Sequence, residues 1–189
     1  MMTERERELL DAFVEGNESA FEELITESRE RIYRTVMRIV RNHEDALDVM
    51  QDSLVKAFRK RKSFRGDSSF STWLTSIAVR EAINRVKRDR FRNAISLSLL
   101  GSRPAPEKHN PDAEAERSIT EERIDAAISQ LPPVQRAVFT MKFHEDYTLR
   151  EIGELVGSSE GAVKASYYHA VRKLRMSLRD LRENPRERK

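Results

Sequence analysis

The sequence predicts an all-α protein made of two small helical domains that a flexible linker joins. Charged residues make up 35% of the 189 residues and aromatic residues 7%, with only 6 Gly and 6 Pro, a composition typical of long helices. Apolar residues recur with a helical period in several stretches, and capping residues precede most of them. This length, with 38% apolar content, suits one ordinary domain or two small ones and argues against a large enzyme domain.

The first predicted domain spans residues 1–92 and contains four helices. The stretch from Ser19 to Glu22 has the form of a capping box, while Asn42 and Ser69 are plausible N-caps of the next two helices. Residues 63–69 interrupt the periodicity and are predicted to form a loop. In chain order, the four helices are expected at about residues 3–15, 19–40, 42–60 and 69–92.

The linker is predicted at residues 93–111, where the chain contains three of its six prolines and has no sustained amphipathic period. Fully extended, these nineteen residues reach roughly 63 Å, so the two domains could bind distant parts of a larger partner. The second domain, residues 112–189, contains a capping box from Thr148 to Glu151, a turn at Gly157 and an N-cap at Ser158 or Ser159. Its helices are expected at about residues 112–130, 134–143, 149–156 and 159–182.

The composition also excludes several kinds of chemistry. The chain has no Cys, so it has no disulfide, Cys-ligated zinc, iron–sulfur cluster or thiol nucleophile, in keeping with a reducing cytoplasm. The N-terminal residues are charged and no stretch approaches the roughly 18 apolar residues of a membrane span, so we expect a cytoplasmic protein without membrane insertion. The four His residues lack metal-ligand spacing and no phosphate-binding glycine loop is present, so no cofactor is expected.

The charge alternates in sign along the chain. Residues 1–60 have a net charge of −4 and residues 61–92 of +6, and the pattern repeats with −3 for residues 121–156 and +5 for residues 157–189. A repeated acidic-then-basic order predicts that each domain has one surface for a polyanion and another for a different partner. The alternative for any single run is a solvated helix face.

The C-terminal domain has the layout of a helix-turn-helix. A short helix with apolar residues inward, a glycine turn and a second helix with a serine cap are the parts of this motif, although ordinary bundles also contain such pairs. On a helical wheel of the last helix, Val163, Ala170 and Leu174 lie toward the core. The opposite side, which we call the reading arc, carries Lys164, Ala165, Tyr168, His169, Arg172 and Arg175. Its N-terminal members are candidates for contacts with base edges, and its two arginines for contacts with phosphates.

The apolar face of the helix after residue 69 changes direction along its length. Phe70 and Trp73 belong to one arc in its first half, whereas Val79 and Val86 belong to a nearly opposite arc in its second half, so we expect only one arc to be core. On the side of Trp73, the helix carries Arg80, Asn84, Lys87, Arg88 and Phe91. Rings interleaved with cations suit single-stranded nucleic acid, whose bases stack on aromatic side chains, unless Trp73 is simply a core residue.

The helix at residues 42–60 has the opposite character. Its exposed positions include Asp45, Asp48, Gln51 and Asp52. An acidic helix repels DNA, so this side is predicted to dock a protein, although a solvated face is the default interpretation for each residue alone.

Two stretches resemble the extracytoplasmic-function (ECF) sigma factors of RNA polymerase. EDALDVMQDSLVKAFRK followed by FRGDSSFSTWLTSIA is similar to the second conserved region of that family. LPPVQRAVFTMKFHEDYTLREIGELVGSSEGAVKASYYHAVRKLR is similar to its fourth region, and the two occur in the family's order. The resemblance covers nearly the whole chain outside the linker and the termini, and it implies a protein without catalysis of its own.

This resemblance implies three binding surfaces and their partners. Asp45, Asp48, Gln51 and Asp52 would grip the clamp helices of core RNA polymerase, and the last helix would read the minus-35 element with Lys164, Ala165, Tyr168 and His169. Promoter DNA would be bound both as duplex and melted, and family members are often held by an anti-sigma factor. The residues implied in minus-10 melting and base capture are Phe64, Arg65, Ser68, Phe70, Trp73, Arg80, Asn84, Lys87 and Arg88.

The sequence departs from the family pattern at two places. Many members have Asn where this chain has Arg80, and Arg is common where this chain has Ser166, His169 and Val171. Its preferred promoter sequences are therefore not inferred from relatives.

Two other functions compete with promoter recognition. A stand-alone helix-turn-helix regulator would bind duplex DNA tightly without polymerase. A nuclease or phosphate-ester hydrolase would need metal ligands or a nucleophile–base pair, and the sequence contains no such motif.

Overall fold

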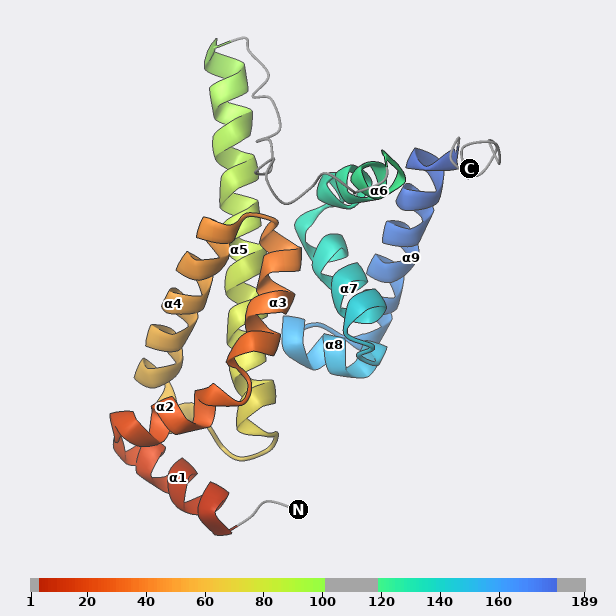
Figure 1. The fold of residues 1–189 in the computed structure, drawn as a ribbon. Coiled ribbons are helices and arrows are strands. Elements are labelled where there is room, and N and C mark those ends of the chain that lie inside the picture. Colours follow the sequence, from red (N-terminus) through yellow and green to blue (C-terminus); the bar gives the residue numbers. More distant parts are fainter. Residues whose placement is uncertain (1–3, 101–118, 180–189) are drawn as a thin grey trace.

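The computed structural model describes residues 4–100, the N-terminal segment, and residues 119–179, the C-terminal segment (Figure 1). Both are helical apart from their turns, which confirms the all-α prediction, and none of the described helices is long and apolar enough to cross a membrane. The elements are α1 (Glu4–Glu15), α2 (Glu18–Thr26), α3 (Arg29–Val40), α4 (His43–Arg59), the short 3-10 helix η1 (Arg61–Ser63), α5 (Phe70–Leu100), α6 (Ile119–Gln130), α7 (Pro133–His144), α8 (Leu149–Val156) and α9 (Glu160–Ser177).

Helix starts are set by the capping residues that the sequence indicates. In Asn42, Ser69 and Ser159, a side-chain oxygen accepts a hydrogen bond from the backbone N–H three residues later. Thr148 and Glu151 form the expected capping box before α8. Hydrogen bonds from the backbone N–H and hydroxyl of Thr148 lower the pKa of Glu151.

The prediction of one continuous helix over residues 19–40 is wrong. The chain breaks between α2 and α3, and Asn17, not Ser19, caps α2. At the break, both the N–H and the hydroxyl of Ser28 donate to the carbonyl of Ile25, a local pattern that competes with the i→i−4 ladder. The resulting bend lets α2 cross the end of the bundle, where Phe21 stacks on Phe13 of α1 with ring centroids 5.2 Å apart.

Two predicted helix ends are also corrected. Helix α5 continues to Leu100, so the first eight residues of the predicted linker are helical, while residues 101–111 of that linker lie outside the described segments. Helix α9 ends at Ser177, with Leu178 as its C-cap, rather than near Arg182. The predicted helix starts at residues 3 and 112 lie outside the described residues.

Helix α5 is the centre of the fold, and the expectation that only one of its apolar arcs is core is wrong. Phe70 and Leu74 of the first arc are buried, and so are Val79, Ala82 and Val86 of the second. Helices α3 and α4 contact α5, and so do α7 and α8 from the C-terminal segment (Figure 1). A helix packed on several sides needs apolar residues around most of its circumference.

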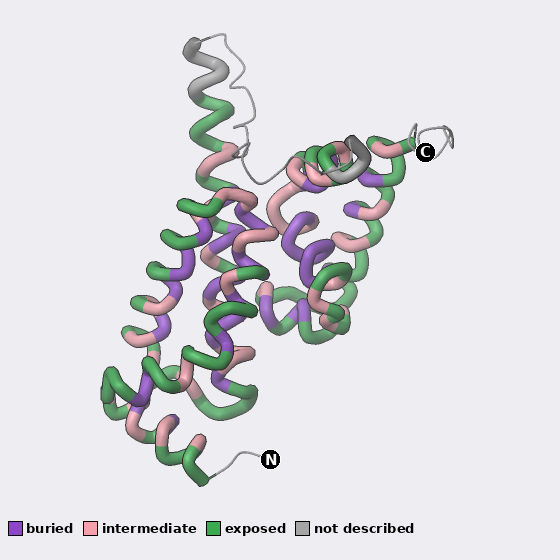
Figure 2. Tube along the Cα trace, in the orientation of Figure 1, coloured by how far each residue is buried: buried purple, intermediate pink, exposed green. Residues whose placement is uncertain are grey.

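The two segments share one apolar cluster. Figure 2 shows buried positions on the sides of helices that face the junction between the segments. From the C-terminal side the cluster receives Met141 of α7 and Ile152 and Leu155 of α8, all at most 1% exposed. A second, smaller cluster joins α6, α7 and α9 around Leu131 and Ala170. The C-terminal segment is therefore packed against the N-terminal one by apolar burial.

The turn between α8 and α9 requires glycine at two positions. Gly157 has φ of 74°, the left-handed conformation that favours glycine, and its N–H donates to the carbonyl of Gly153. Gly153 lies inside α8, where a Cβ would be only 2.8 Å from the backbone oxygen of Ser158. The close approach of α8 to the turn therefore fixes the angle of the helix-turn-helix.

Replacement of Gly153 tests this packing. We expect Gly153→Ala to lower the free energy of unfolding by about 1 to 3 kcal/mol, because backbone must move to admit the methyl group. Gly161→Ala is the matched control, since no atom lies within 4 Å of its Cβ position and alanine favours the helix. Thermal or urea unfolding measures both variants, and equal midpoints would contradict the predicted contact.

Candidate nucleic-acid and protein interfaces

The reading arc of α9 is fully exposed. Val163, Ala170 and Leu174 are buried beneath the helix, as the wheel predicts. All six members of the reading arc are exposed, and the Tyr168 ring is 62% exposed with its centroid 5.7 Å from that of His169. The arc therefore presents hydrogen-bonding side chains near the N-terminal end of α9 and cations toward its C-terminal end.

The predicted strip of rings and cations on α5 is divided in two by the fold. Asn84, Lys87 and Arg88 are exposed, and so are Arg65 and Ser68 in the preceding loop. Phe91 is also exposed, whereas Phe70 and Trp73 belong to a cluster of six rings between α1, α2, α4, α5 and the loop. This aromatic cluster consists of Phe13, Phe21, Phe58, Phe64, Phe70 and Trp73.

Within the aromatic cluster, Phe70 and Trp73 have different positions. Phe70 is 3% exposed and supports its neighbours from inside the core, so its contact with DNA stays a prediction that this burial does not favour. Trp73 is half-buried and packs against Phe13, Phe64 and Phe70, with centroids 6.1, 5.4 and 6.0 Å away. Sequence reasoning missed Phe13 and Phe21, whose spacing along the chain gives no indication of this contact.

Arg80 points at the C-terminal segment. Its Nε donates to the carbonyl of Leu155 and its Nη2 to that of Glu154, both at 2.9 Å. These carbonyls end α8, where unpaired carbonyl groups give the helix a partial negative charge. In this arrangement Arg80 is exposed, and two nitrogens of its guanidinium are bonded to the end of α8.

The acidic side of α4 combines charge with exposed apolar groups. Asp48, Gln51 and Asp52 are exposed, as expected. Leu47 and Val55, also on α4, are 50% and 45% exposed. The helical wheel could have shown this, because Leu47 lies near Gln51 and away from Val49. Apolar and acidic groups together suit a protein partner.

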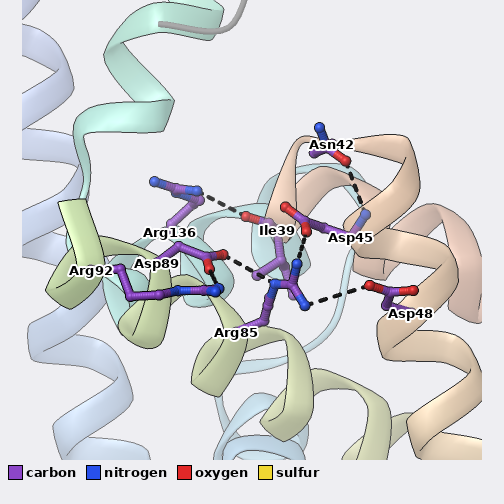
Figure 3. Close-up of polar contacts among 8 residues, drawn as sticks. All are labelled: Ile39, Asn42, Asp45, Asp48, Arg85, Asp89, Arg92 and Arg136. Atoms are coloured by element: carbon purple, nitrogen blue, oxygen red, sulfur yellow. Dashed lines mark hydrogen bonds and ion pairs between the residues drawn. The ribbon is translucent and has the colours of Figure 1, made fainter. Parts of the chain in front are cut away.

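Asp45 differs from its neighbours because it is tied to α5. Arg85 forms an ion pair with Asp45 and lies 3.6 Å from an oxygen of Asp48 and 3.3 Å from one of Asp89 (Figure 3). Burial acts to lower the pKa of Arg85, but the three carboxylates outweigh it, so the pKa is raised. Arg92 adds a further ion pair to Asp89 at 2.5 Å. Asp48 and Asp52 are therefore the more available carboxylates of the acidic side.

The described residues contain no group of three His, Asp or Glu side chains placed to hold a metal ion.

Comparison with known proteins identifies the family. The Sigma-70 region 2 family matches residues 24–92, and the Sigma-70 region 4 family matches residues 121–174. The chain is 30% identical over 158 residues to the ECF RNA polymerase sigma factor SigM of Mycobacterium tuberculosis, covering 84% of this chain and 76% of SigM. The chain belongs to the ECF sigma factors. It is also similar to the RNA polymerase sigma factor SigV of Bacillus subtilis, with 28% identity over 157 residues, 82% of this chain and 88% of SigV.

A solved structure supports the fold. The sigma factor RpoE from Bartonella quintana, solved in complex with the anti-sigma factor NepR, matches with a TM-score of 0.63 and 19% identity, covering 84% of this chain and 96% of that one. As a member of the ECF sigma factors, the protein with the sequence above binds core RNA polymerase and promoter DNA, and it directs promoter-specific initiation of transcription. A stand-alone regulator is not favoured, because the match to region 2 extends over α3, α4 and most of α5.

The packing of Trp73 can be tested by its removal. We expect Trp73→Ala to lower the free energy of unfolding by about 2 to 3 kcal/mol, less than for a fully buried ring. Phe91→Ala is the control, because this aromatic residue of α5 is 68% exposed and should leave stability unchanged. Thermal unfolding of both variants is the measurement, and an unchanged melt for Trp73→Ala would show that the indole adds nothing to the core.

Proposed function

We propose a division of labour among three surfaces of this ECF sigma factor. The acidic side of α4 docks core polymerase, the loop at residues 64–68 and α5 act on the minus-10 element, and the reading arc of α9 recognises the minus-35 element. Residues 1–92 and 112–189 are the two functional domains of this proposal. The observation that carries it is the two-sided character of α9, buried along Ala170 and Leu174 and exposed along the whole reading arc.

Charge and shape support the docking role of α4. Asp48 and Asp52 lie beside the exposed side chains of Leu47 and Val55, so a partner can bury apolar surface and pair its cations at the same place. Asp45 also has a structural role, because its ion pair with Arg85 fastens α4 to α5.

The minus-10 role is best supported for the exposed polar residues. Arg65, Ser68, Asn84, Lys87 and Arg88 are accessible to a strand. Phe64 and Trp73 are half-buried edges of the aromatic cluster, on which an unstacked base could rest, while Phe70 supports them from below. Arg80 is exposed as well, with its guanidinium bonded to the end of α8.

The proposal also covers partners and place of action. We infer that the protein has no catalytic activity of its own and acts in the cytoplasm, where the polymerase works. An anti-sigma factor is proposed as a further partner, because the similar sigma factor from Bartonella quintana was solved with one.

Run-off transcription tests the proposal as a whole. Purified core polymerase is incubated with genomic promoter fragments, with and without the protein, and transcripts are mapped. We expect defined start sites only when both proteins are present. Tight, sequence-specific binding to duplex DNA without polymerase, with no run-off product, would instead identify a stand-alone regulator.

Charge reversal on α4 tests the docking surface. Asp48→Arg with Asp52→Arg should weaken binding to core polymerase by at least about tenfold, because two attractive contacts become repulsive. Glu8→Arg with Asp11→Arg makes the same charge change on exposed positions of α1 and should leave the affinity within about twofold. A fluorescence titration with core polymerase measures both pairs, and equal affinities would exclude α4 as the docking helix.

Substitutions on the reading arc separate base reading from phosphate contact. Tyr168→Ala or Lys164→Ala should reduce discrimination at one or two minus-35 positions by about 1 to 3 kcal/mol. Arg175→Ala should weaken binding to all promoter sequences alike. It should also reduce the salt dependence of the binding affinity by roughly one released ion. Competition binding of the holoenzyme to promoters with single base changes makes the distinction. An equal loss of affinity for all promoters in Tyr168→Ala would show that the Tyr168 ring contacts phosphate or packs against the protein, and does not read a base.

A further inference from the structure

Helix α1 lies outside the part of the chain that matches a sigma-factor region, yet it packs beneath the surface proposed for the minus-10 element. The match to Sigma-70 region 2 begins at residue 24, whereas α1 ends at Glu15. Figure 1 shows α1 near the end of the bundle at which α5 begins. There α1 contacts the aromatic cluster and η1. The family match therefore assigns α1 no role, while its contacts suggest one.

Phe13 connects α1 to the aromatic cluster. Its side chain is fully buried, with 0% exposed. Its ring centroid lies 5.3 Å from that of Phe70 and 6.1 Å from that of Trp73, and both contacts are edge-on. Edge-to-face packing restricts the orientation of the rings as well as their distance. Phe13 therefore helps to fix the orientation of the Trp73 indole.

Arg61, the first residue of η1, provides a second connection to α1. A Cβ added at Gly16, directly after α1, would lie 3.1 Å from Nη2 of Arg61 and 3.2 Å from its Nε, so the guanidinium occupies the space that a side chain would fill. The guanidinium also lies over the ring of Phe58, with Cζ 5.0 Å from the centroid, and Nη1 donates to the Phe58 carbonyl at 3.1 Å. Nε is buried and has no hydrogen-bond partner among the described residues. Because a buried N–H without a partner costs free energy, packing and not bonding alone holds the guanidinium in place.

The loop at residues 64–68 starts from these contacts. The N–H of Phe64 donates to the carbonyl of Arg61 at 3.1 Å, and the Phe64 ring packs on Trp73 with centroids 5.4 Å apart. Beyond Phe64, residues 65–68 are exposed. The start of the loop is thus held by η1 and by the aromatic cluster, and both of these rest on α1.

We propose that α1 braces the loop at residues 64–68 for its action on the minus-10 element, with Phe13 and Arg61 as positioning residues. Phe13 fixes the orientation of Trp73 from inside the core, and Arg61 fixes the point at which the loop leaves η1. Phe13 does this without touching DNA, because its ring is fully buried. The action of the loop on the minus-10 element rests on the proposed function, whereas the brace is a property of the free chain.

The fluorescence of Trp73 tests the brace in the free, full-length protein. The chain has one tryptophan, so its emission reports on the aromatic cluster alone. In Arg61→Ala we expect acrylamide quenching of Trp73 to rise at least about twofold, with emission shifted to the red, because the ring loses packing that keeps water away. Arg5→Ala is the matched control. It also removes an arginine contact of α1, the exposed ion pair with Glu23, but not the contact with η1, and its quenching should equal that of the wild type.

Discrimination among minus-10 sequences tests the purpose of the brace. Holoenzymes with each variant compete for forked promoter fragments that have an unpaired minus-10 strand and single base changes. In Arg61→Ala we expect the ratio of affinities for preferred and changed bases to fall at least about fivefold, because a displaced loop no longer presents its polar groups at fixed positions. Affinity for core polymerase and discrimination at the minus-35 element should be those of the wild type, as in Arg5→Ala.

Gly16→Ala reaches the same contact from the side of α1. Its methyl group would crowd the guanidinium of Arg61, so we expect raised quenching and reduced discrimination in this variant too. The double variant Gly16→Ala with Arg61→Ala should show no more than the larger single effect, because substitutions that remove one shared contact are not additive. Circular dichroism must show unchanged helix content. If Arg61→Ala fails to fold, Arg61→Lys takes its place, since it keeps the charge but lacks the planar fork.

Three results would overturn the inference: equal quenching in Arg61→Ala and wild type, raised quenching with unchanged minus-10 discrimination, or full additivity in the double variant. Failure of the proposed function is seen separately, as the absence of run-off transcripts from the wild-type holoenzyme. The quenching measured in the free chain then still decides whether α1 braces the loop.

Discussion

The burial of α5 on several sides is the constraint on which the rest of the structure depends. A helix this long would normally expose one side to water, but here Phe70 and Leu74 pack toward the aromatic cluster while Val79 and Val86 are buried further along. Because α3, α4, α7 and α8 all contact it, α5 determines both the shape of region 2 and the place where region 4 rests. Among the polar side chains of α5, Arg80, Arg85 and Arg90 bond to neighbouring helices or their ends, whereas Asn84, Lys87 and Arg88 are exposed.

Arginine serves two kinds of partner in this protein. On α9, Arg172 and Arg175 extend into solvent, where phosphates can reach them. At the junction of the segments, Arg80 and Arg90 bond to helix-end carbonyls, whose partial charge is a weaker substitute for an anion. A sequence rich in arginine therefore does not by itself distinguish a DNA surface from an internal contact.

Local patterns predicted much of the fold and of the surface on α9. Caps at Asn42, Ser69, Thr148 and Ser159 were visible because a side chain and a nearby amide decide them within one turn. The reading arc was visible because α9 has one buried side. The positions of Phe70 and Arg80 were not predictable, since they depend on α1, α2 and α8, which are distant in sequence. The break at Ser28 was missed because a serine inside a helical pattern gives no fixed signal.

The ion pairs between α4 and α5 couple the positions of these two helices. Arg85 binds Asp45 near one end of α4, and Lys56 binds Glu81 near the other, so the two helices are fastened at both ends. A polymerase bound to α4 would therefore also determine the position and orientation of α5. The two helices are thereby held as one unit, so a partner bound at the acidic side of α4 and a partner bound on the exposed side of α5 would be kept in a fixed relation to each other.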